Sequence, residues 1–416
     1  MKLKRVVVTG LGALTPIGNT VPEFWDGLLN GASGAGPITK FDTSKFKTQF
    51  ACEVKGYNPN DHFDRKEARK YDLFAQYAMV VADQAVKDAG LDVFKYDPDR
   101  VGVIWGSGIG GLDTFLKEIS DFAKGDGTPR FSPFFIPKMI ADIAAGHISI
   151  KYGFRGPNFT TTSACASAAN ALVDSLNYIR LGKADVFISG GSEAAVNEAG
   201  LGGFNALTAL STRNDDPATA SRPFDKDRDG FVLGEGAGCI VFEELEHAKA
   251  RGAKIYCEVA GGGLSADAYH MTAPDPEGKG AMKVMQYTLE DGDLKPEDVD
   301  HINTHGTSTP LGDIAEPTAI VNLFGEHAKK ISINSTKSMT GHLLGAAGAA
   351  EAIATILAVQ NDIVPPTINH FTDDPEIAVL DFTFHEAKKR TVNVALSNTF
   401  GFGGHNACIA FKKYAE

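Results

Sequence analysis

The stretch GEGAGCIVFEE at residues 234–244 is repeated near the other end of the chain as GFGGHNACIAFKK at residues 401–413. Each copy begins with a glycine-rich turn, continues as Cys-Ile-x-Phe and ends in charged residues. Cys239 and Cys408 alternate with apolar neighbours, which predicts two buried β-strands. The repeat indicates two similar halves, the alternative being a chance match of a short motif.

The segments that precede the two copies strengthen the case for duplication. TTSACASAANAL (161–172) and KSMTGHLLGAAGAAEAI (337–353) both contain a turn that leads into an alanine-rich helix. Cys165 lies 239 − 165 = 74 residues before its strand cysteine, and His342 lies 408 − 342 = 66 residues before the other. We therefore expect halves at 1–257 and 258–416, and because no low-complexity linker separates them, one fused core.

Short β-branched runs alternate with amphipathic stretches along the whole chain. This alternation predicts an α/β fold with mainly parallel strand pairing. Strands are expected at 5–9, 101–105, 186–189, 238–243, 255–260, 331–333, 392–396 and 407–412, and helices at 73–89, 166–181 and 280–291.

Composition narrows the functional classes. The 416 residues include 40 Lys+Arg and 52 Asp+Glu, a net charge of −12, which disfavours nucleic acid and anionic membranes as partners. A hydrophobic fraction of 43% excludes a disordered chain. The 45 glycines show no three-residue period, so a collagen-like chain is excluded as well.

The remaining composition signals favour the cytoplasm. Five scattered cysteines without a CxxC pair fit a reducing compartment better than a disulfide framework. The basic start MKLKRVVVTGLGALTPIG superficially resembles a signal peptide, but Thr9, Gly10 and Gly12 interrupt its apolar run, which favours a first core strand. The alanine-rich segment 342–359 is too short and polar to span a bilayer.

Cys165, within NFTTTSACASAAN (158–170), is a candidate nucleophile. At the first turn of a helix, the helix dipole would lower the pKa of its thiol. Free backbone N–H groups at the same turn can bind a developing oxyanion. The alternative is an ordinary buried cysteine.

The segment DHINTHGTSTPLGD (300–313) places His305 at the end of a short extended run, beside glycine and small hydroxyl residues, which suits a catalytic base. His301 lies four residues earlier, but in a strand this spacing separates the two by about 13 Å, which disfavours a metal pair. Asp313 and Glu316 either orient the loop or are solvated.

His342 follows Lys337 and opens the second alanine-rich helix, where the helix dipole would keep its imidazole neutral. Lys337 can supply local charge, and Glu351 can pair with a cation. The loop SNTFGFGGHN (397–406) can supply further oxyanion N–H groups and project Phe402 toward the site, or can be a simple tight hairpin.

Two further glycine motifs carry weaker signals. GSGIGG (106–111) formally contains G-x-G-x-x-G but lacks the acidic-ended second strand of a dinucleotide site. GGSEA (190–194) nearly forms a nucleophile elbow but ends in alanine. We interpret both as close packing around a tunnel.

The combination of TTSACASA, NTHGTSTPLGD, STKSMTGHLLGAAGA and the GFGGHN loop resembles the β-ketoacyl-acyl-carrier-protein synthases, which are condensing enzymes of the thiolase fold. GSGIGGL, the segment 209–238 and PPTIN make the elongating members the most similar. The resemblance covers essentially the whole chain and implies two pseudo-duplicated halves in a five-layered αβαβα core. His405 departs from it, since the family usually has Thr there.

The resemblance also implies residue roles. Cys165 would carry the acyl chain, and His305 and His342 would assist decarboxylation of malonyl-carrier protein, with Lys337 supporting them electrostatically. Phe402 would gate the second substrate and complete the oxyanion hole. Ile109 and Thr307 would contact substrate. No cofactor and no catalytic metal is expected, although the family allows a structural monovalent cation near Asn303, Glu351, Ser397 and Asn398.

The implied partners are acyl- and malonyl-loaded acyl carrier protein and a second copy of the chain. An acidic carrier needs a basic surface, and the segment DRKEARK offers one helical face formed by Arg65, Lys66, Arg69 and Lys70. The alternative is a solvated charge run.

Related enzyme classes differ at identifiable positions. A thiolase would have a second catalytic cysteine in the last loop, a starter-type synthase an Asn at His342, and a chain-length factor no nucleophile. A polyketide ketosynthase shares the Cys-His-His set and stays open, as does the preferred acyl chain length.

Overall fold

One ten-stranded sheet organises the chain. The computed structural model describes residues 3–92 and 95–415, and the strand order is β10-β9-β13-β14-β8-β1-β7-β6-β4-β5. These strands are β1 (Val6–Leu14), β4 (Val101–Gly106), β5 (Asn158–Thr161), β6 (Val186–Glu193), β7 (Gly236–Glu244), β8 (Cys257–Ala266), β9 (His301–Asn303), β10 (Ser332–Asn334), β13 (Val394–Gly401) and β14 (His405–Lys412). Two small ribbons pair β2 (Gly36–Pro37) with β3 (Phe50–Ala51) and β11 (Ile363–Val364) with β12 (Lys388–Lys389).

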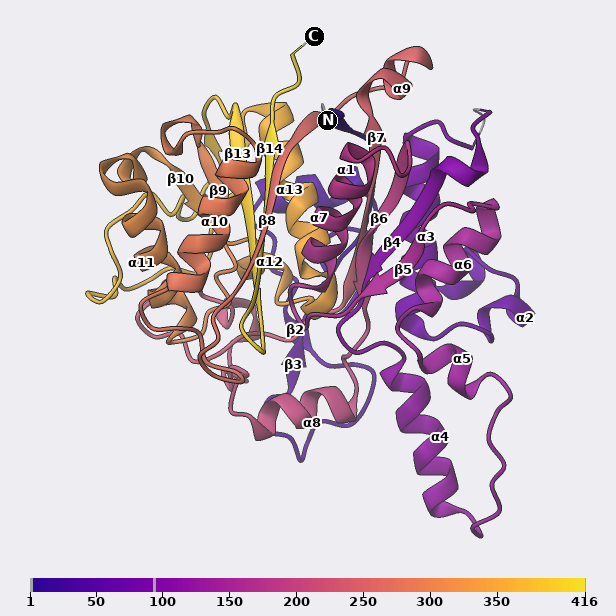
Figure 1. Ribbon diagram of the computed structural model, residues 1–416. Coiled ribbons are helices and arrows are strands. Elements are labelled where there is room, and N and C mark those ends of the chain that lie inside the picture. Colours follow the sequence, from indigo (N-terminus) through magenta and orange to yellow (C-terminus); the bar gives the residue numbers. More distant parts are fainter. Residues whose placement is uncertain (1–2, 93–94, 416) are drawn as a thin grey trace.

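The helices lie in three layers around the two halves of this sheet (Figure 1). Helices α7 and α13 lie between the halves, α3 and α6 cover the outer face of one half, and α10 and α11 cover the other. The helices are α1 (Val21–Leu29), α2 (Arg65–Ala68), α3 (Leu73–Asp88), α4 (Leu112–Lys124), α5 (Phe135–Met139), α6 (Ile143–Tyr152), α7 (Ser167–Arg180), α8 (Glu198–Ala206), α9 (Leu245–Ala250), α10 (Lys279–Asp291), α11 (Gly312–Phe324), α12 (Lys337–Thr340) and α13 (Ala347–Asn361).

The duplication predicted from the repeat is confirmed by the strand order. Read outward from the centre, one half runs β8-β14-β13-β9-β10 and the other β1-β7-β6-β4-β5. The repeated motif forms β7 and β14, the second strand in each direction. Strands β1 and β8 pair only at 6–8 and 257–259 before they separate, so the sheet opens around α7 and α13 and gives five layers.

The prediction of mainly parallel pairing is wrong. Strand β7 runs antiparallel to β1 and β6, β8 runs antiparallel to β1 and β14, and β13 pairs antiparallel with β14. Parallel pairing occurs at β4 with β5 and β6, and at β9 with β10 and β13. Strands between two helical layers are apolar on both faces whatever their direction, so their composition imitates that of parallel strands.

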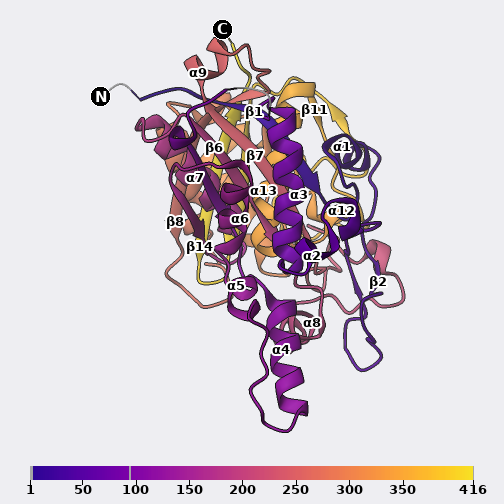
Figure 2. The same cartoon turned by 90° about the vertical axis from the view of Figure 1, so that its right-hand side faces the viewer.

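The buried core explains why α7 and α13 are rich in alanine. Thirteen residues of α13 are buried, because this helix contacts strands of both halves and only small side chains fit between them. Figure 2 shows α3 lying across the outside of its sheet, where its buried face packs on β1, β7 and β6. Among the described residues, no helix is both long and apolar enough to cross a bilayer.

Candidate active site

Cys165 lies on a strained turn between β5 and α7. Ala164, immediately before it, has φ of 51°, which is unusual for a residue with a side chain. Helix α7 begins at Ser167, so Cys165 precedes the helix rather than lying in its first turn. The end of β13 lies directly against this turn: a Cβ on Gly401 would be 2.6 Å from the Ser163 carbonyl oxygen, so only glycine fits.

Three residues from distant parts of the sequence meet here. Nε2 of His342 lies 3.0 Å from Sγ of Cys165, and the rings of His342 and His305 are 5.3 Å apart between centroids. His342 is held by its backbone N–H, which donates to the carbonyl of Val232, and by the edge of the Phe231 ring. The structure therefore brings together the candidate nucleophile and both histidines that the sequence singled out.

These three residues line a cavity of about 400 Å³, which Phe402 and Thr307 also line. The Phe402 backbone N–H lies near the sulfur of Cys165 and acts to lower the pKa of that thiol. A backbone N–H beside the sulfur can also serve as a donor to an oxyanion formed there. The hydroxyls of Thr307 and Thr309 lie 3.0 Å apart in the same wall.

The expected lowering of the Cys165 pKa is wrong. Burial raises the pKa of this thiol to about 12, although the charge of Lys337 and the Phe402 N–H act in the opposite direction. A helix terminus stabilises a thiolate by about 1 kcal/mol, which is less than the cost of removing a charge from water. The free site therefore holds a neutral thiol.

Both histidines are neutral as well. Burial, followed by the nearby charge of Lys337, holds the pKa of His305 and of His342 well below 6.5. Lys337 is only 1% exposed and forms an ion pair with Glu351. Because His342 precedes α13 by five residues, the lysine and burial, rather than the helix dipole, set its protonation state.

Glu316 and Asp313 lie in the interior of the protein, so the solvated alternative does not hold. The carboxylate of Glu316 accepts the backbone N–H groups of His305 and Gly306, each at 3.0 Å, and fixes the loop that carries the histidine. Burial raises its pKa to about 7. Asp313 accepts the backbone N–H of Phe224 and so ties the same region to another loop.

Other candidate residues lie elsewhere. Ile109 is outside the lining of this cavity and its side chain is 40% exposed. His405 is the exposed first residue of β14, with its ring against Gly403, and does not line the cavity. His301 is buried in β9 with Nδ1 2.8 Å from the carbonyl oxygen of Ser332, and is not paired with His305.

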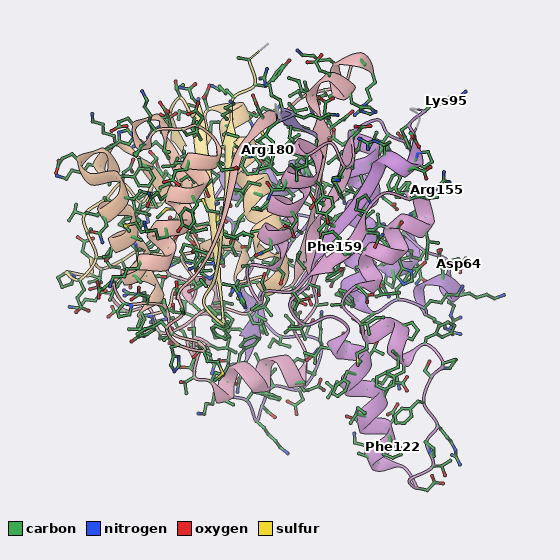
Figure 3. The ribbon with its side chains drawn as sticks, in the orientation of Figure 1. Asp64, Lys95, Phe122, Arg155, Phe159 and Arg180 are labelled. Carbon is green, nitrogen blue, oxygen red and sulfur yellow. The ribbon has the colours of Figure 1, made fainter. Side chains whose placement is uncertain are left out.

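The four residues of the expected docking face are all exposed on and beside α2. Asp64 caps this short helix by accepting the backbone N–H groups of Lys66 and Glu67 (Figure 3). Within 3–92 and 95–415, none of the four basic side chains forms an ion pair, so their charge is available to a partner; they are Arg65, Lys66, Arg69 and Lys70.

Beside the Lys337–Glu351 pair, four buried oxygens lack a hydrogen-bond partner within the described part of the chain. They are Asn303 Oδ1, Glu351 Oε2, Ser397 Oγ and Asn398 Oδ1. Ser397 is directly opposite Asn303 in the sheet, so these atoms come from neighbouring positions. Oxygen acceptors of this kind suit a hard monovalent cation. In contrast, no group of three or more His, Cys, Asp and Glu side chains suited to a metal ion is present among the described residues.

Comparison with known proteins identifies the family. Residues 3–248 match the model for the beta-ketoacyl synthase N-terminal domain, and residues 256–371 match the C-terminal domain. The chain belongs to the beta-ketoacyl synthase family. This synthase is 50% identical over 414 residues to the 3-oxoacyl-(acyl-carrier-protein) synthase 2 of Synechocystis sp., covering 100% of this chain and 99% of that one. The enzyme of the same name from Staphylococcus aureus is also 50% identical, with 99% of both chains covered.

Solved structures agree with this assignment. A beta-ketoacyl synthase from Burkholderia phymatum superposes with a TM-score of 0.92 at 34% identity, covering 99% of this synthase and 100% of that chain. A type II polyketide acyl-carrier protein in complex with its ketosynthase, bound to the hexaketide, gives a TM-score of 0.90 at 34% identity with the same coverage. The thiolase-like fold implied by the sequence is thus confirmed.

Proposed function

We propose that this synthase elongates fatty acyl chains, with Cys165 as the acyl carrier within the enzyme. The reaction joins a malonyl group on acyl carrier protein to an acyl chain on Cys165 and gives 3-oxoacyl-carrier protein and CO2. The observation that carries this proposal is the 3.0 Å contact between His342 and Cys165 beside His305, in a chain half identical to 3-oxoacyl-(acyl-carrier-protein) synthases over its full length.

The first step is transfer of the acyl chain. Sγ of Cys165 forms a bond to the acyl carbonyl carbon, the carbon–sulfur bond to the carrier breaks, and the carrier leaves as a thiol. Because burial raises the thiol pKa to about 12, the proton must leave as the attack proceeds, and Nε2 of His342 is in position to pass it to the departing sulfur. The N–H groups of Cys165 and Phe402 stabilise the tetrahedral oxyanion.

The second step is decarboxylative condensation. The malonyl carboxylate leaves as CO2 and its bonding electrons remain as an enolate on the carrier thioester. Neutral His305 donates its N–H to the enolate oxygen, and His342 does the same once its Nε2 has regained a proton from solvent after the first step. Burial and the positive charge of Lys337 keep both rings neutral. The enolate carbon bonds to the acyl carbon, the bond to Cys165 breaks, and the thiolate takes up one proton.

The carrier protein docks, we infer, on the basic face formed by Arg65, Lys66, Arg69 and Lys70. Support comes from the exposure of these four side chains and from the absence of ion pairs at them within the described residues, which leaves their charge available to an acidic partner. Thr307 lines the cavity where a carrier-bound chain would enter.

A homodimer is supported by two unpartnered features. Strand β5 is the edge of the large sheet and, among the residues that the structure describes, pairs only with β4, which leaves backbone groups open to a second copy. Helix α4 extends away from the sheet in both ribbon views and exposes Phe115, Ile119 and Phe122 at helical spacing (Figures 1 and 2). Figure 3 labels Phe122 on this arm and Phe159 on the edge strand.

The oligomeric state tests this proposal directly. Ile119→Asp with Phe122→Asp should convert a dimer into a monomer in analytical ultracentrifugation. Val379→Asp, at a site 93% exposed elsewhere, is the control. A monomeric parent protein would refute the dimer.

Two structural elements complete the proposal. The halves are 1–257 and 258–416, with the boundary at the start of β8. The unpartnered oxygens of Asn303, Glu351, Ser397 and Asn398 would hold a monovalent cation beside the Lys337–Glu351 ion pair. Five buried free cysteines are consistent with action in the cytoplasm.

The test of function is product formation. Parent protein, Cys165→Ala and His305→Ala are each supplied with acyl- and malonyl-carrier protein, and carrier-bound products are weighed by mass spectrometry. We expect a 3-oxoacyl chain two carbons longer from the parent only. No elongated product from fatty acyl carriers, with product from polyketide carriers, would instead assign the enzyme to polyketide synthesis.

A further inference from the structure

Glu193 is a buried carboxylate with no counter-cation among the described residues. It is the last residue of β6, is fully buried, and belongs to the GGSEA motif for which the sequence suggested only packing. A buried carboxylate is costly unless hydrogen bonds satisfy its oxygens. Four donors do so here, and they come from two separate loops.

The first loop is the glycine motif that formally resembles a phosphate-binding sequence. The backbone N–H groups of Gly108 and Ile109 donate to Glu193 at 2.8 and 3.1 Å, and the Ser107 hydroxyl donates at 3.2 Å. Consecutive backbone N–H groups form an anion-binding concavity. The anion in this concavity is the protein's own carboxylate, which explains why the motif appears without a nucleotide site.

The second loop follows His342. The backbone N–H of Gly345 donates to the same Oε2 atom that Gly108 contacts, at 3.0 Å. The two loops are so close that a Cβ on Gly345 would lie 2.3 Å from the Gly108 nitrogen. Leu344, between His342 and Gly345, has φ of 50°, so this segment depends on outside contacts to keep its conformation.

The first loop also contacts the turn of the nucleophile. A Cβ on Gly108 would lie 3.2 Å from the carbonyl oxygen of Ala164, the residue before Cys165. The Thr162 hydroxyl donates to the Ser107 carbonyl at 3.1 Å. One carboxylate thus joins the segment that supports Cys165 to the segment that carries His342.

Resting on the proposed function, we propose that Glu193 is a positioning residue that sets the placement of His342 relative to Cys165. Its side chain does not line the cavity that contains Cys165. Because a displacement of about 1 Å at a reacting pair can cost about 100-fold in rate, loss of this tie should slow acyl transfer without weakening carrier docking.

Two variants separate geometry from charge. Glu193→Gln replaces one acceptor oxygen by an N–H₂ group that faces backbone donors, whereas Glu193→Asp keeps the charge but shortens the side chain by one methylene. Both should lower the acyl-transfer rate constant at saturating carrier by about 10- to 100-fold, with the KM for carrier changed less than threefold. An Asp variant with the parent rate constant would show that charge alone matters and would overturn the proposal.

Two controls keep the test decisive. Glu243→Gln alters another fully buried carboxylate, on β7, whose partners are Thr9, His247 and Arg251, so it should cost stability without slowing acyl transfer. Ser107→Ala removes one donor and should give a smaller loss in the same direction if the Glu193 variants fold poorly. Equal slowing by Glu243→Gln would overturn the proposal.

Iodoacetamide alkylation of Cys165 needs no carrier protein. It therefore separates failure of the proposed function from failure of the positioning role of Glu193. If the parent protein accepts no acyl chain, the proposed function fails. If the charge-conserving Glu193→Asp variant still changes the alkylation rate several-fold while Glu243→Gln does not, the positioning role stands on its own. Unchanged alkylation and unchanged acyl transfer in both Glu193 variants would refute it.

Discussion

Replacing Gly401 by alanine tests the oxyanion site at its tightest contact. The φ of Gly401 lies outside the left-handed region, so alanine is allowed by backbone conformation and the effect is purely one of space. The new Cβ would lie 2.6 Å from the Ser163 oxygen and 3.1 Å from the Cys165 nitrogen. Ordinary contact begins at 3.4 Å, so the turn must move by about 3.4 − 2.6 = 0.8 Å.

Such a shift would misplace the Cys165 N–H, which we propose as a donor to the developing oxyanion. Loss of one donor of this kind costs about 10²- to 10³-fold, or about 2.7–4 kcal/mol of transition-state stabilisation. Single-turnover acyl transfer from acyl-carrier protein, followed by intact-protein mass spectrometry, measures this loss directly. The KM for the carrier should stay near its parent value, because the proposed docking face lies outside the cavity.

The matched control is Gly203→Ala on α8, where a Cβ meets nothing within 4 Å and alanine favours the helix. This variant should react at the parent rate and be at least as stable. A folded Gly401→Ala protein that acylates within threefold of the parent would contradict the assignment of the Cys165 N–H to the oxyanion site.

Three further predictions concern charge and protonation. Lys66→Glu with Arg69→Glu should raise the KM for acyl-carrier protein about tenfold and leave the kinetics with small thioester substrates unchanged. The control Lys389→Glu, on β12, should change neither. Unchanged kinetics in the double variant would refute the docking face. Because burial raises the Cys165 pKa to about 12, its alkylation by iodoacetamide should accelerate about tenfold per pH unit from pH 7 to 9, and a plateau in that range would contradict a neutral thiol. The pKa of His305 lies well below 6.5 in the folded protein, so below pH 6.5 the unfolded chain binds a proton that the folded protein does not. The free energy of unfolding should therefore fall with falling pH, by up to about 1.4 kcal/mol per pH unit from this residue. In urea titrations, His305→Asn should lose this contribution to the pH dependence. Parallel pH profiles for parent and variant would show that His305 titrates normally.

The sequence predicted the duplication and the strand positions, because these depend on local patterns. It also selected Cys165, His305 and His342, which the structure places side by side. Hydrophobic runs mark the buried strands, and the repeat around Cys239 and Cys408 marks equivalent strands of the two halves. Strand direction escaped prediction, since burial on both faces leaves the same composition in parallel and antiparallel strands.

The electrostatics of the site could not be predicted in the same way. The pKa of Cys165 depends on how completely the two halves exclude water, which is a property of tertiary packing, whereas the helix-dipole argument considers only neighbours in sequence. The position of Ile109 outside the cavity also depends on three-dimensional arrangement.

Glu193 and Glu316 illustrate a second limit. Glu193 accepts backbone N–H groups from loops far away in the sequence, and Glu316 accepts one from His305, eleven residues earlier. Neither carboxylate has a sequence signature that separates it from a solvated acid. One indirect signal for Glu193 is the GSGIGG segment, which has the form of an anion-binding loop. Where such a loop binds no nucleotide, a buried carboxylate of the protein itself is a natural partner for its backbone N–H groups.

The central claim is that Cys165 carries the acyl chain between the two half-reactions. The most direct measurement incubates the protein with acyl-carrier protein, digests it and locates the added acyl mass, and then adds malonyl-carrier protein. We predict the acyl mass on the Cys165 peptide, and its disappearance on addition of malonyl-carrier protein as CO2 and the elongated 3-oxoacyl product form. Elongation without any acyl adduct on Cys165, or an adduct there that malonyl-carrier protein fails to discharge, would contradict the mechanism.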